Sequence, residues 1–506
     1  MLWDPSNEPW LTLEAPLLAW RGPQGELRLS RAGAPIGGPL LGVAPPLPPG
    51  ALGAASFRAA HGVTGNLMAC AMAGGVSSVP MVEAMSRAGR LAIFGAGGLP
   101  IDEVEAAVRA LGDRLGPNAP WGVNLLASPS EPAAELALAE RLVAGRAPVV
   151  VASAFLEPTP ALVWLHAHAL RRGPDGSVTR APRLMVKLSS PALAARFLAP
   201  PPASMLAELV GSGKLTAEQA RIAGQTPLTE DITVEGDSGG HTDRQPALLL
   251  LAALIELRRR LGVTARVGLA GGLGTPEAVA AAFVAGADYV VTGSVNQATV
   301  EAGTSAAVKR LLCRLSHGQT DFAPAADMLE IGASVQVVKS GTLFPGRARR
   351  LQQLWQQHGG WDDLPEPTRQ ELETTYFRAP VAEVRRAVYA WAAERDPALA
   401  AAAARDPRVD LALLVRWYLG LSSRWARAGV EERAVDWQIW CGPAMAAFNA
   451  WVAGSALAPP EARGVVAVND ALLRGAALSL RARMLTLQGV PVPDALLHPR
   501  PPQPQR

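Results

Sequence analysis

Short apolar runs alternate over roughly the first 300 residues with segments in which apolar positions recur at helical spacing. The runs cover residues 67–75, 91–98, 121–127, 148–155, 183–189, 231–240, 265–272 and 288–294. Segments such as Ser78–Gly89 and Thr275–Gly286, with a helical pattern, separate them. Runs without polar alternation are typical of strands buried on both faces of a parallel sheet. About eight strand–helix units in succession predict the α/β class and a (β/α)₈ TIM barrel.

The pattern changes on both sides of this predicted barrel. Residues 1–55 are rich in Pro and Gly and predict an irregular N-terminal segment, with a short strand near Leu27–Leu29. Residues 56–345 form the predicted barrel, and helical patterns without strand-like runs predict a C-terminal helical region over 346–506. The connection after Ser189 is roughly twice the usual length, which predicts a helical insertion near 190–228. We expect that insertion to lie over the C-terminal mouth of the barrel and to contact substrate.

Composition and charge exclude several classes of function. Lys and Arg total 47 against 44 Asp and Glu, a formal charge of +3. The sequence lacks a basic stripe with interleaved aromatic residues, so nucleic-acid binding is not expected. The three cysteines are far apart and form no CxxC pair, so neither a disulfide framework nor a metal site is expected. The N-terminus lacks a signal-peptide pattern, and no run approaches eighteen apolar residues. We therefore expect a cytoplasmic protein that does not bind membranes.

Glycines gather where the predicted strands end. They occur as pairs at residues 74–75, 97–98, 239–240 and 271–272, and singly at Gly293. The last two loops, AGGLGTPEA and TGSVNQA, are each followed by a helical pattern, which favours an anion held by main-chain amides and a helix N-terminus. Thr292 or Ser294 could add a hydroxyl group. Tight turns without a ligand are the alternative interpretation. Neither GAGGLP nor GGLGTPE fits GxGxxG, so a mononucleotide or a sugar phosphate is favoured over a dinucleotide.

His241 follows a glycine pair just past the sixth predicted strand, on the mouth side. An imidazole there can donate a proton or a hydrogen bond to a developing enolate or nitronate oxygen. Asp237 and Asp243 flank it and could orient the ring, or could cap a helix.

Two polar residues interrupt apolar strands. Lys187 is the sole charge in LMVKLS, where it could stabilise an anion in the mouth or extend its ammonium group to the rim. Asn124 in WGVNLL could hydrogen-bond a ligand ring or hold a loop. Arg347, Arg349 and Arg350 could meet an acidic partner helix, although a solvated charge run is the simpler interpretation.

Longer motifs carry a resemblance to a known family. DITVEGDSGGHTD, ARVGLAGGLGTPEA and DYVVTGSVNQATVEAGTS resemble the nitronate monooxygenase (2-nitropropane dioxygenase)-like FMN proteins. APAADMLEIG, RWYLGLSSRWA and DWQIWCGPAMAAFNAWVAGS more specifically resemble the PfaD-type trans-acting enoyl reductases of polyunsaturated fatty acid and polyketide synthases. The last two motifs are absent from short nitronate oxygenases. TDRQP and GDSGG replace the commoner TDNRP and ADSGG beside His241.

The resemblance implies FMN at the barrel mouth and His241 as the catalytic residue beside its ring. The implied cofactor contacts are Met72, Ala73, Gly74, Asn124, Lys187, Gly240, Gly271, Gly272, Gly293 and Ser294, the last four at the phosphate. NADPH or NADH would supply hydride for reduction of an enoyl thioester on an acyl carrier protein, which would be a separate partner. A nitronate monooxygenase and a non-catalytic scaffold subunit are the alternatives. A homodimer is one expectation for the assembly.

Overall fold

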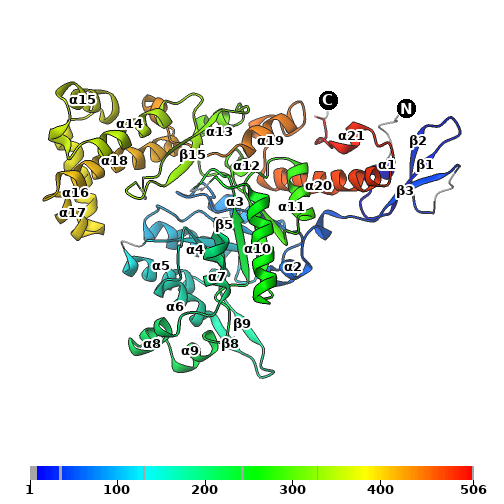
Figure 1. Cartoon of the computed structure of the whole chain (residues 1–506), viewed down its shortest axis with the longest axis horizontal. Coiled ribbons are helices and arrows are strands. Elements are labelled where there is room, and N and C mark those ends of the chain that lie inside the picture. Colours follow the sequence, from blue (N-terminus) through cyan, green and yellow to red (C-terminus); the bar gives the residue numbers. More distant parts are fainter. Residues whose placement is uncertain (1–7, 34–36, 129–130, 241–243, 327–328, 504–506) are drawn as a thin grey trace.

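Eight parallel strands close into a barrel in the computed structural model, which describes residues 8–33, 37–128, 131–240, 244–326 and 329–503 (Figure 1). The strands are β4 (Leu67–Ala69), β5 (Ala92–Phe94), β6 (Trp121–Leu126), β7 (Val149–Ser153), β10 (Arg183–Leu188), β11 (Asp231–Glu235), β12 (Arg266–Ala270) and β13 (Tyr289–Thr292). Pairing of β13 with β4, with Val291 opposite Met68, closes the ring. The predicted TIM barrel is confirmed, because each of the eight apolar runs contains one strand of the closed barrel. The strands lack polar alternation because both of their faces are covered.

Helices return the chain between the strands. They are α2 (Ala55–His61) before the first strand, then α3 (Val79–Arg87), α4 (Ile101–Leu115), α5 (Pro132–Ala144), α6 (Pro160–Ala169), α7 (Pro191–Leu198), α10 (Ala247–Leu261) and α11 (Pro276–Val284). Local sequence fixes their starts: the Ser78 and Thr275 hydroxyls accept N–H groups of Met81 and Ala278. After β13 come only the short α12 (Ser294–Gln297) and α13 (Ala306–Leu312). The place of an eighth barrel helix, between α11 and α3, is taken by α20 (Val465–Leu487) from near the end of the chain.

The predicted insertion contains α7 and two further helices, α8 (Ala203–Gly211) and α9 (Ala217–Ala223). α8 and α9 pack against α6 and, with the hairpin of β8 (Leu170–Arg172) and β9 (Val178–Arg180), lie at the amino-terminal end of the barrel, below it in Figure 1. The expectation that the insertion covers the mouth is therefore wrong for α8 and α9, and of the described residues 190–228 only Leu193, in the first turn of α7, lines the cavity at the mouth. The added helices follow α7, and a barrel helix leads the chain back to the amino ends of the strands.

A cluster of charged side chains fills the amino end of the barrel. The Asp231 carboxylate, buried at the start of β11, accepts two hydrogen bonds from the Arg266 guanidinium, at 2.6 and 2.7 Å. Nε2 of His61, the last residue of α2, lies 3.2 Å from the same carboxylate. This cluster serves stability, because barrels build their sites at the opposite end.

The N-terminal segment is more regular than predicted. It holds the short α1 (Glu8–Leu11) and an antiparallel sheet of β1 (Leu17–Arg21), β2 (Leu27–Arg31) and β3 (Leu40–Ala44), in the order β2-β1-β3. The sheet packs on α20, whose buried Arg481 donates to the carbonyls of Thr12 and Ala15.

A second lobe has its own buried cluster of apolar residues. It contains the antiparallel hairpin of β14 (Thr320–Pro324) and β15 (Ser334–Val338), then α14 (Phe344–Gln357), α15 (Glu366–Glu371), a π-helical turn (Leu372–Phe377), α16 (Val381–Arg395), α17 (Pro397–Ala403) and α18 (Pro407–Ala428). Beyond it, α19 (Ala444–Val452), α20 and α21 (Asp494–Leu497) belong to the cluster of the barrel. The domain limits given above stay a prediction; the buried clusters place the hairpin with the helices that follow it.

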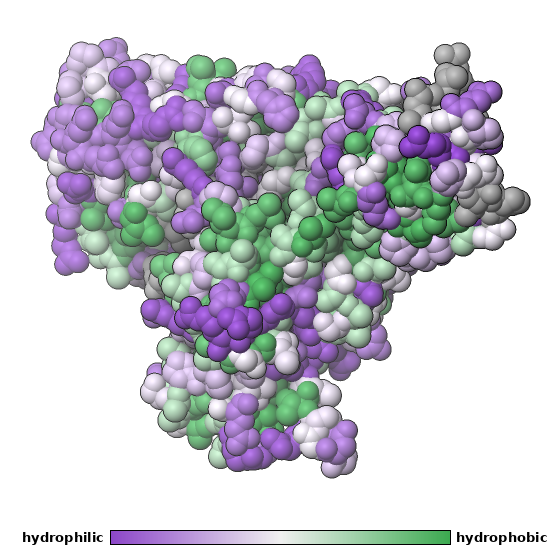
Figure 2. Space-filling model, turned by 45° about the vertical axis from the view of Figure 1, so that its right-hand side comes forward, coloured by the Kyte–Doolittle hydropathy of each residue, from purple (hydrophilic) through white to green (hydrophobic). Residues whose placement is uncertain are grey.

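Apolar surface gathers in the middle of the face shown in Figure 2. The outer sides of α10 and α11 expose Leu248, Leu249 and Val284. Within the described ranges, no helix combines the length and the apolar character needed to cross a bilayer.

Candidate active site

A cavity of about 670 Å³ opens at the carboxyl ends of the barrel strands. Every strand contributes to its wall at or just after its last residue: Cys70, Gly97, Leu126, Ser153, Leu188, Glu235, Ala270 and Gly293. This is the end at which TIM barrels bind their ligands. Its size is that of a cofactor or substrate site.

The structure brings nine of the ten predicted cofactor-binding residues to the wall of this cavity. They are Met72, Ala73, Asn124, Lys187, Gly240, Gly271, Gly272, Gly293 and Ser294. Gly74 lies just behind the wall, where a Cβ atom would come within 2.9 Å of the Arg427 guanidinium carbon. His241 and Asp243 are outside the described residues; the preceding Gly240 lines the cavity.

Lys187 is held in the cavity by a carboxylate. Its Nζ atom lies 2.8 Å from Glu235 at the end of the neighbouring strand, and 3.9 Å from the sulfur of Cys70. Burial acts to lower the pKa of Lys187, but the negative charge of Glu235 and its hydrogen bond to the ammonium group raise it above its usual value. Burial also raises the pKa of the Cys70 thiol. Cys70 is therefore a neutral thiol at neutral pH, and Glu235 is the counter-charge that keeps the lysine an ammonium ion.

Asn124 holds a loop, as one of the two expectations had it, and its hydrogen bond to a ligand stays a prediction. Its Oδ1 accepts the N–H groups of Ala96 and Gly97, at 2.7 and 3.3 Å, and so fixes the loop after β5. Its side chain also lines the cavity. Among the described residues the amide nitrogen has no hydrogen-bond acceptor, which leaves a donor for a ligand.

The two glycine loops of the seventh and eighth strands lie side by side in the wall. Gly271 and Gly272 adopt φ values of +99° and +73°, a backbone conformation that is strained for residues with a side chain. Nothing lies within 4 Å of the position that a Cβ atom would take at Gly272. The backbone there is free to approach a ligand closely. Ser294 accepts the N–H of Gly442 at 2.9 Å and joins the loop to the C-terminal segment. Thr292 offers no hydroxyl to the cavity.

Thr292 is buried behind the wall. Its hydroxyl donates to Asn469 of α20 at 2.7 Å and accepts from Asn296 at 3.0 Å. The prediction that Thr292 could serve a phosphate is therefore wrong, because residues at the end of a barrel strand alternate between the interior and the surrounding helices.

Segments from the second half of the chain cover the mouth. The covering residues are Ala325, Ala326, Ile331, Ala333, Ser334 and Val335 of the hairpin, Leu419, Gly420 and Ser423 of α18, and Gln438, Trp440, Gly442 and Ala444. Most are apolar, and they complete the wall around the charged pair. The longer sequence motifs contain many of these residues, but no pattern in them indicated a place at the mouth. Glu235 was missed as well, because it ends an ordinary strand pattern.

Asp237 faces the cavity near the covering hairpin. Burial raises the pKa of its carboxyl group, and the charge of Arg244 acts against that rise. The amide nitrogen of Gln336, in the orientation that satisfies both of its polar atoms, donates to Asp237 at 3.2 Å. Whether Asp237 orients His241 stays a prediction.

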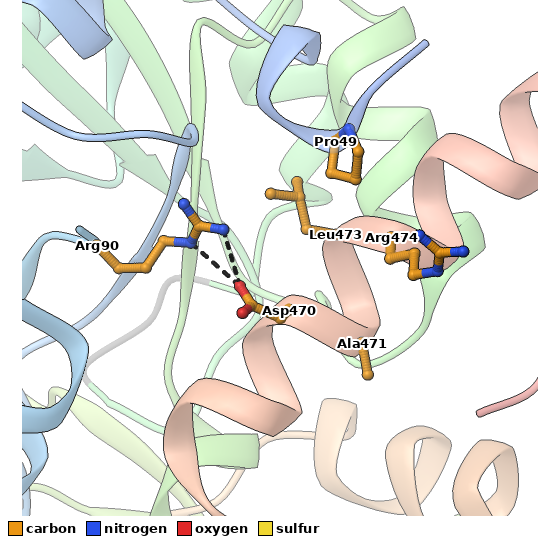
Figure 3. A pocket seen from close by; sticks show the side chains of 6 residues that line it. All are labelled: Pro49, Arg90, Asp470, Ala471, Leu473 and Arg474. Atoms are coloured by element: carbon orange, nitrogen blue, oxygen red, sulfur yellow. Dashed lines mark hydrogen bonds and ion pairs between the residues drawn. The ribbon is translucent and has the colours of Figure 1, made fainter. Parts of the chain in front are cut away.

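A smaller cavity of about 290 Å³ lies between the barrel and α20 (Figure 3). Its three charged side chains have partners: the Arg90 guanidinium donates to Asp470 at 2.9 and 3.1 Å, and Arg474 donates to the carbonyl of Leu11 at 2.9 Å. The described residues contain no group of His, Cys, Asp and Glu that could hold a metal ion.

Comparison with known proteins adds to this geometry. Residues 358–437 match the family described as acyl-carrier-protein S-malonyltransferase, inserted helical domain. The chain is 40% identical over 444 residues to "Polyketide biosynthesis protein PksE" of Bacillus subtilis, covering 86% of this chain and 57% of that protein. It is 40% identical over 456 residues to one of the proteins that make up the polyunsaturated fatty acid synthase of Thraustochytrium sp., covering 86% of this chain and 30% of that protein. The chain thus spans little more than half of the first relative and less than a third of the second.

A solved structure matches over its full length. The enoyl reductase domain of MlnA, from the macrolactin biosynthesis cluster of Bacillus amyloliquefaciens, is 36% identical with a TM-score of 0.82, and the match covers 87% of this chain and 100% of that domain. With the barrel, the cavity and the synthase relatives, this match shows that the chain belongs to the PfaD-type enoyl reductases, an oxidoreductase family of polyketide and polyunsaturated fatty acid synthases.

Proposed function

We propose that this chain is an FMN-dependent enoyl reductase that uses NADPH or NADH to reduce the α,β double bond of an enoyl thioester carried by an acyl carrier protein. One observation carries the proposal. A cavity at the barrel mouth holds a paired lysine and two glycine loops, in a chain similar over most of its length to the MlnA enoyl reductase domain.

The wall of the cavity fits a flavin mononucleotide. Backbone amides at Gly271, Gly272 and Gly293, with the Ser294 hydroxyl, suit a phosphate at the end of the seventh and eighth strands. The Asn124 amide and the Lys187 ammonium group offer a donor and a positive charge to a ring held deeper in the mouth. These are the residue types that tune a flavin by hydrogen bonds and charge.

Bound FMN would supply the two-electron chemistry that moves a hydride from the nicotinamide to the β-carbon of the substrate. The residues of this chain do the rest. The ammonium group of Lys187, kept charged by Glu235, favours negative charge in the cavity. The apolar covering residues Leu419 and Trp440 exclude water, which strengthens that interaction. We assign His241 a hydrogen bond or a proton for the developing thioester enolate.

Two findings support a carrier-bound substrate. The relatives are named as a polyketide biosynthesis protein and a component of a polyunsaturated fatty acid synthase, and such synthases carry their intermediates as thioesters. The lobe over the mouth matches a helical domain of an enzyme named for its acyl-carrier-protein substrate. Action in trans and assembly as a homodimer, with the exposed faces of α10 and α11 as candidate contacts, are part of the proposal.

The test starts with the absorption spectrum of the purified chain and with oxidation of NADPH in the presence of a crotonyl thioester. We expect a flavin spectrum with FMN released on denaturation, and thioester-dependent turnover. His241→Ala should lower turnover by about 10²- to 10⁴-fold, the usual share of a general acid. The control is His317→Ala, an exposed histidine that does not line the cavity.

Oxygen-free stopped-flow measurements separate the two enzyme hypotheses. An enoyl reductase, once reduced by NADPH, is reoxidised by the crotonyl thioester. Reduction of the flavin by a nitronate, with no reoxidation by the thioester, would instead establish the nitronate monooxygenase. A colourless protein that binds no FMN would refute both and leave the scaffold hypothesis.

A further inference from the structure

Helix α18 lies across the mouth and presents a mixed face to it. Leu419, Gly420 and Ser423 line the cavity. One turn further along the same face, in the last turn of the helix, comes Arg427, and Arg424 lies three residues before it. Residues three and four apart are neighbours on a helix surface, so the two guanidinium groups lie near each other, just outside the residues that line the cavity.

Arg427 rests on the loop whose neighbouring residues form the cavity wall. Its guanidinium group occupies the space over Gly74, at 2.9 Å from the position of a Cβ there, and Met72 and Ala73 of that loop line the cavity. The space exists because residue 74 is a glycine with φ of +68°. The side chain is half-buried in this position.

The described part of the chain offers these arginines little counter-charge. Neither Arg424 nor Arg427 has a hydrogen bond or an ion pair to a described residue, and the one carboxylate that acts on Arg427 is the exposed Glu103 of α4. Burial and the neighbouring Arg424 lower the pKa of Arg427, and Glu103 raises it. Two like charges on one helix face destabilise it, and a half-buried cation without a partner is costly.

Other arginines of the same lobe are neutralised internally. Arg347 pairs with Asp436, Arg349 with Asp321 at 2.9 Å, and Arg350 with Glu371 at 2.6 Å. The possibility that these three meet an acidic partner is not supported, because each already holds a carboxylate. The dipole of α18 stabilises a cation in its last turn, but it explains only one of the two arginines at the rim.

We propose that Arg424 and Arg427 form a phosphate-binding clamp at the rim of the cavity, which holds the phosphate of an elongated ligand whose reactive end enters the mouth. The inference rests on the proposed function for the identity of that ligand. A guanidinium group presents donors in a planar fork that matches phosphate oxygens, and Arg is the residue used where such binding is specific.

Two ligands of an enoyl reductase carry such a phosphate. One is the phosphopantetheine arm of the carrier, and the other is the 2′-phosphate that distinguishes NADPH from NADH. The clamp chemistry is the same for both, and binding followed by kinetics tells them apart.

Binding is measured first, by calorimetry on the full chain, with 4′-phosphopantetheine against pantetheine and with 2′,5′-ADP against 5′-AMP. We expect wild type to prefer the phosphorylated member of one pair by about 10-fold or more, and the double variant R424Q/R427Q to lose that preference. Arg427→Lys, which keeps the charge and loses the fork, should retain only part of it. Arg386→Gln, an exposed arginine of α16 that does not line the cavity, is the control and should behave as wild type.

Kinetics then identify the source of the phosphate. If the clamp holds the carrier arm, the double variant raises KM for crotonyl-4′-phosphopantetheine and not for crotonyl-pantetheine. If it holds the dinucleotide, KM rises for NADPH and not for NADH. Equal binding of both pairs by wild type and variant, with all four KM values unchanged, would overturn the clamp. Because calorimetry needs no turnover, a failure of the proposed reduction would leave the clamp still tested.

Discussion

Substitution of Gly274 by Ala tests how firmly the C-terminal segment is seated on the glycine loop that follows β12. A Cβ atom at Gly274 would lie 2.1 Å from the carbonyl oxygen of Ala444 and 2.8 Å from its carbonyl carbon. Ordinary contact begins at 3.4 Å, so the loop and the segment must separate by about 1.3 Å, the difference between the two distances. Both sides of the contact are backbone, and neither can rotate away.

The size of the effect follows from this displacement. Overpacking at a fixed contact costs about 1–3 kcal/mol of the free energy of unfolding. A shift of about 1 Å in a positioning segment reduces activity by about 10²-fold. Since Gly272 and Gly442 both line the cavity and would move apart, we expect Gly274→Ala to weaken FMN binding by about 10- to 100-fold.

The assay is a titration of apoprotein with FMN, followed by the quenching of flavin fluorescence, together with urea unfolding. Gly346→Ala, at the start of α14, is the control because nothing lies within 4 Å of a Cβ there. That variant should bind FMN as wild type does. If Gly274→Ala bound FMN within twofold of wild type, the segment would be free to yield, and its assigned part in the site would be wrong.

Three further predictions concern ionisable groups. Burial raises the pKa of Asp231, but its hydrogen bonds to Arg266 and His61 bring that pKa down to about 2. The lowered pKa contributes about 2 kcal/mol to the free energy of unfolding. This contribution is complete above pH 4 and is lost as the pH falls toward 2. Asp231→Asn should lower the free energy of urea unfolding at pH 7 by about 3–5 kcal/mol and remove that part of the pH dependence; unchanged unfolding would contradict it. In Glu235→Gln the carboxylate is gone and burial lowers the pKa of Lys187, so the lysine loses its proton at a lower pH. The kcat/KM of this variant should therefore fall more steeply above pH 8 than that of wild type, while Glu235→Asp should restore the wild-type profile. Burial raises the pKa of Cys441 to about 12, so iodoacetamide at pH 8 should label it only after unfolding, as mass spectrometry would show; rapid labelling of the folded chain would be the contrary result.

The barrel could be predicted from the sequence because its signal is local. Each strand is a short, largely buried run, and in Val149–Ser153 every position is buried; burial on both faces leaves no polar alternation. Lys187 was found for the same reason, since a charge in such a run needs a partner or a ligand. Its partner Glu235 was not found, because a glutamate at the end of a strand is common and only the pairing of adjacent strands brings the two together.

The cover of the site could not be predicted from patterns. The link between Ser294 and Gly442 joins residues 148 apart, and nothing in either neighbourhood records the other. The same holds for α20, which fills the eighth helical position and bonds Thr292 through Asn469 across 177 residues. The insertion was misplaced for a different reason. The sequence indicates the extra length but not whether the added helices come before or after the barrel helix, and that order decides which end of the barrel they reach. Here α7 ends before α8 and α9 begin, so the added helices lie at the amino-terminal end.

The late arrival of the cover has a consequence for synthesis on the ribosome. Ser294 is made 148 residues before Gly442, and at about 5–20 residues per second this interval lasts roughly 7–30 s. Throughout it the nascent barrel has an open, largely apolar mouth, and Thr292 waits for Asn469 still longer. Chaperone binding or early uptake of a flavin at the growing chain would protect that surface, so the protein's yield in cells should depend on what meets the half-made barrel before its last helices emerge.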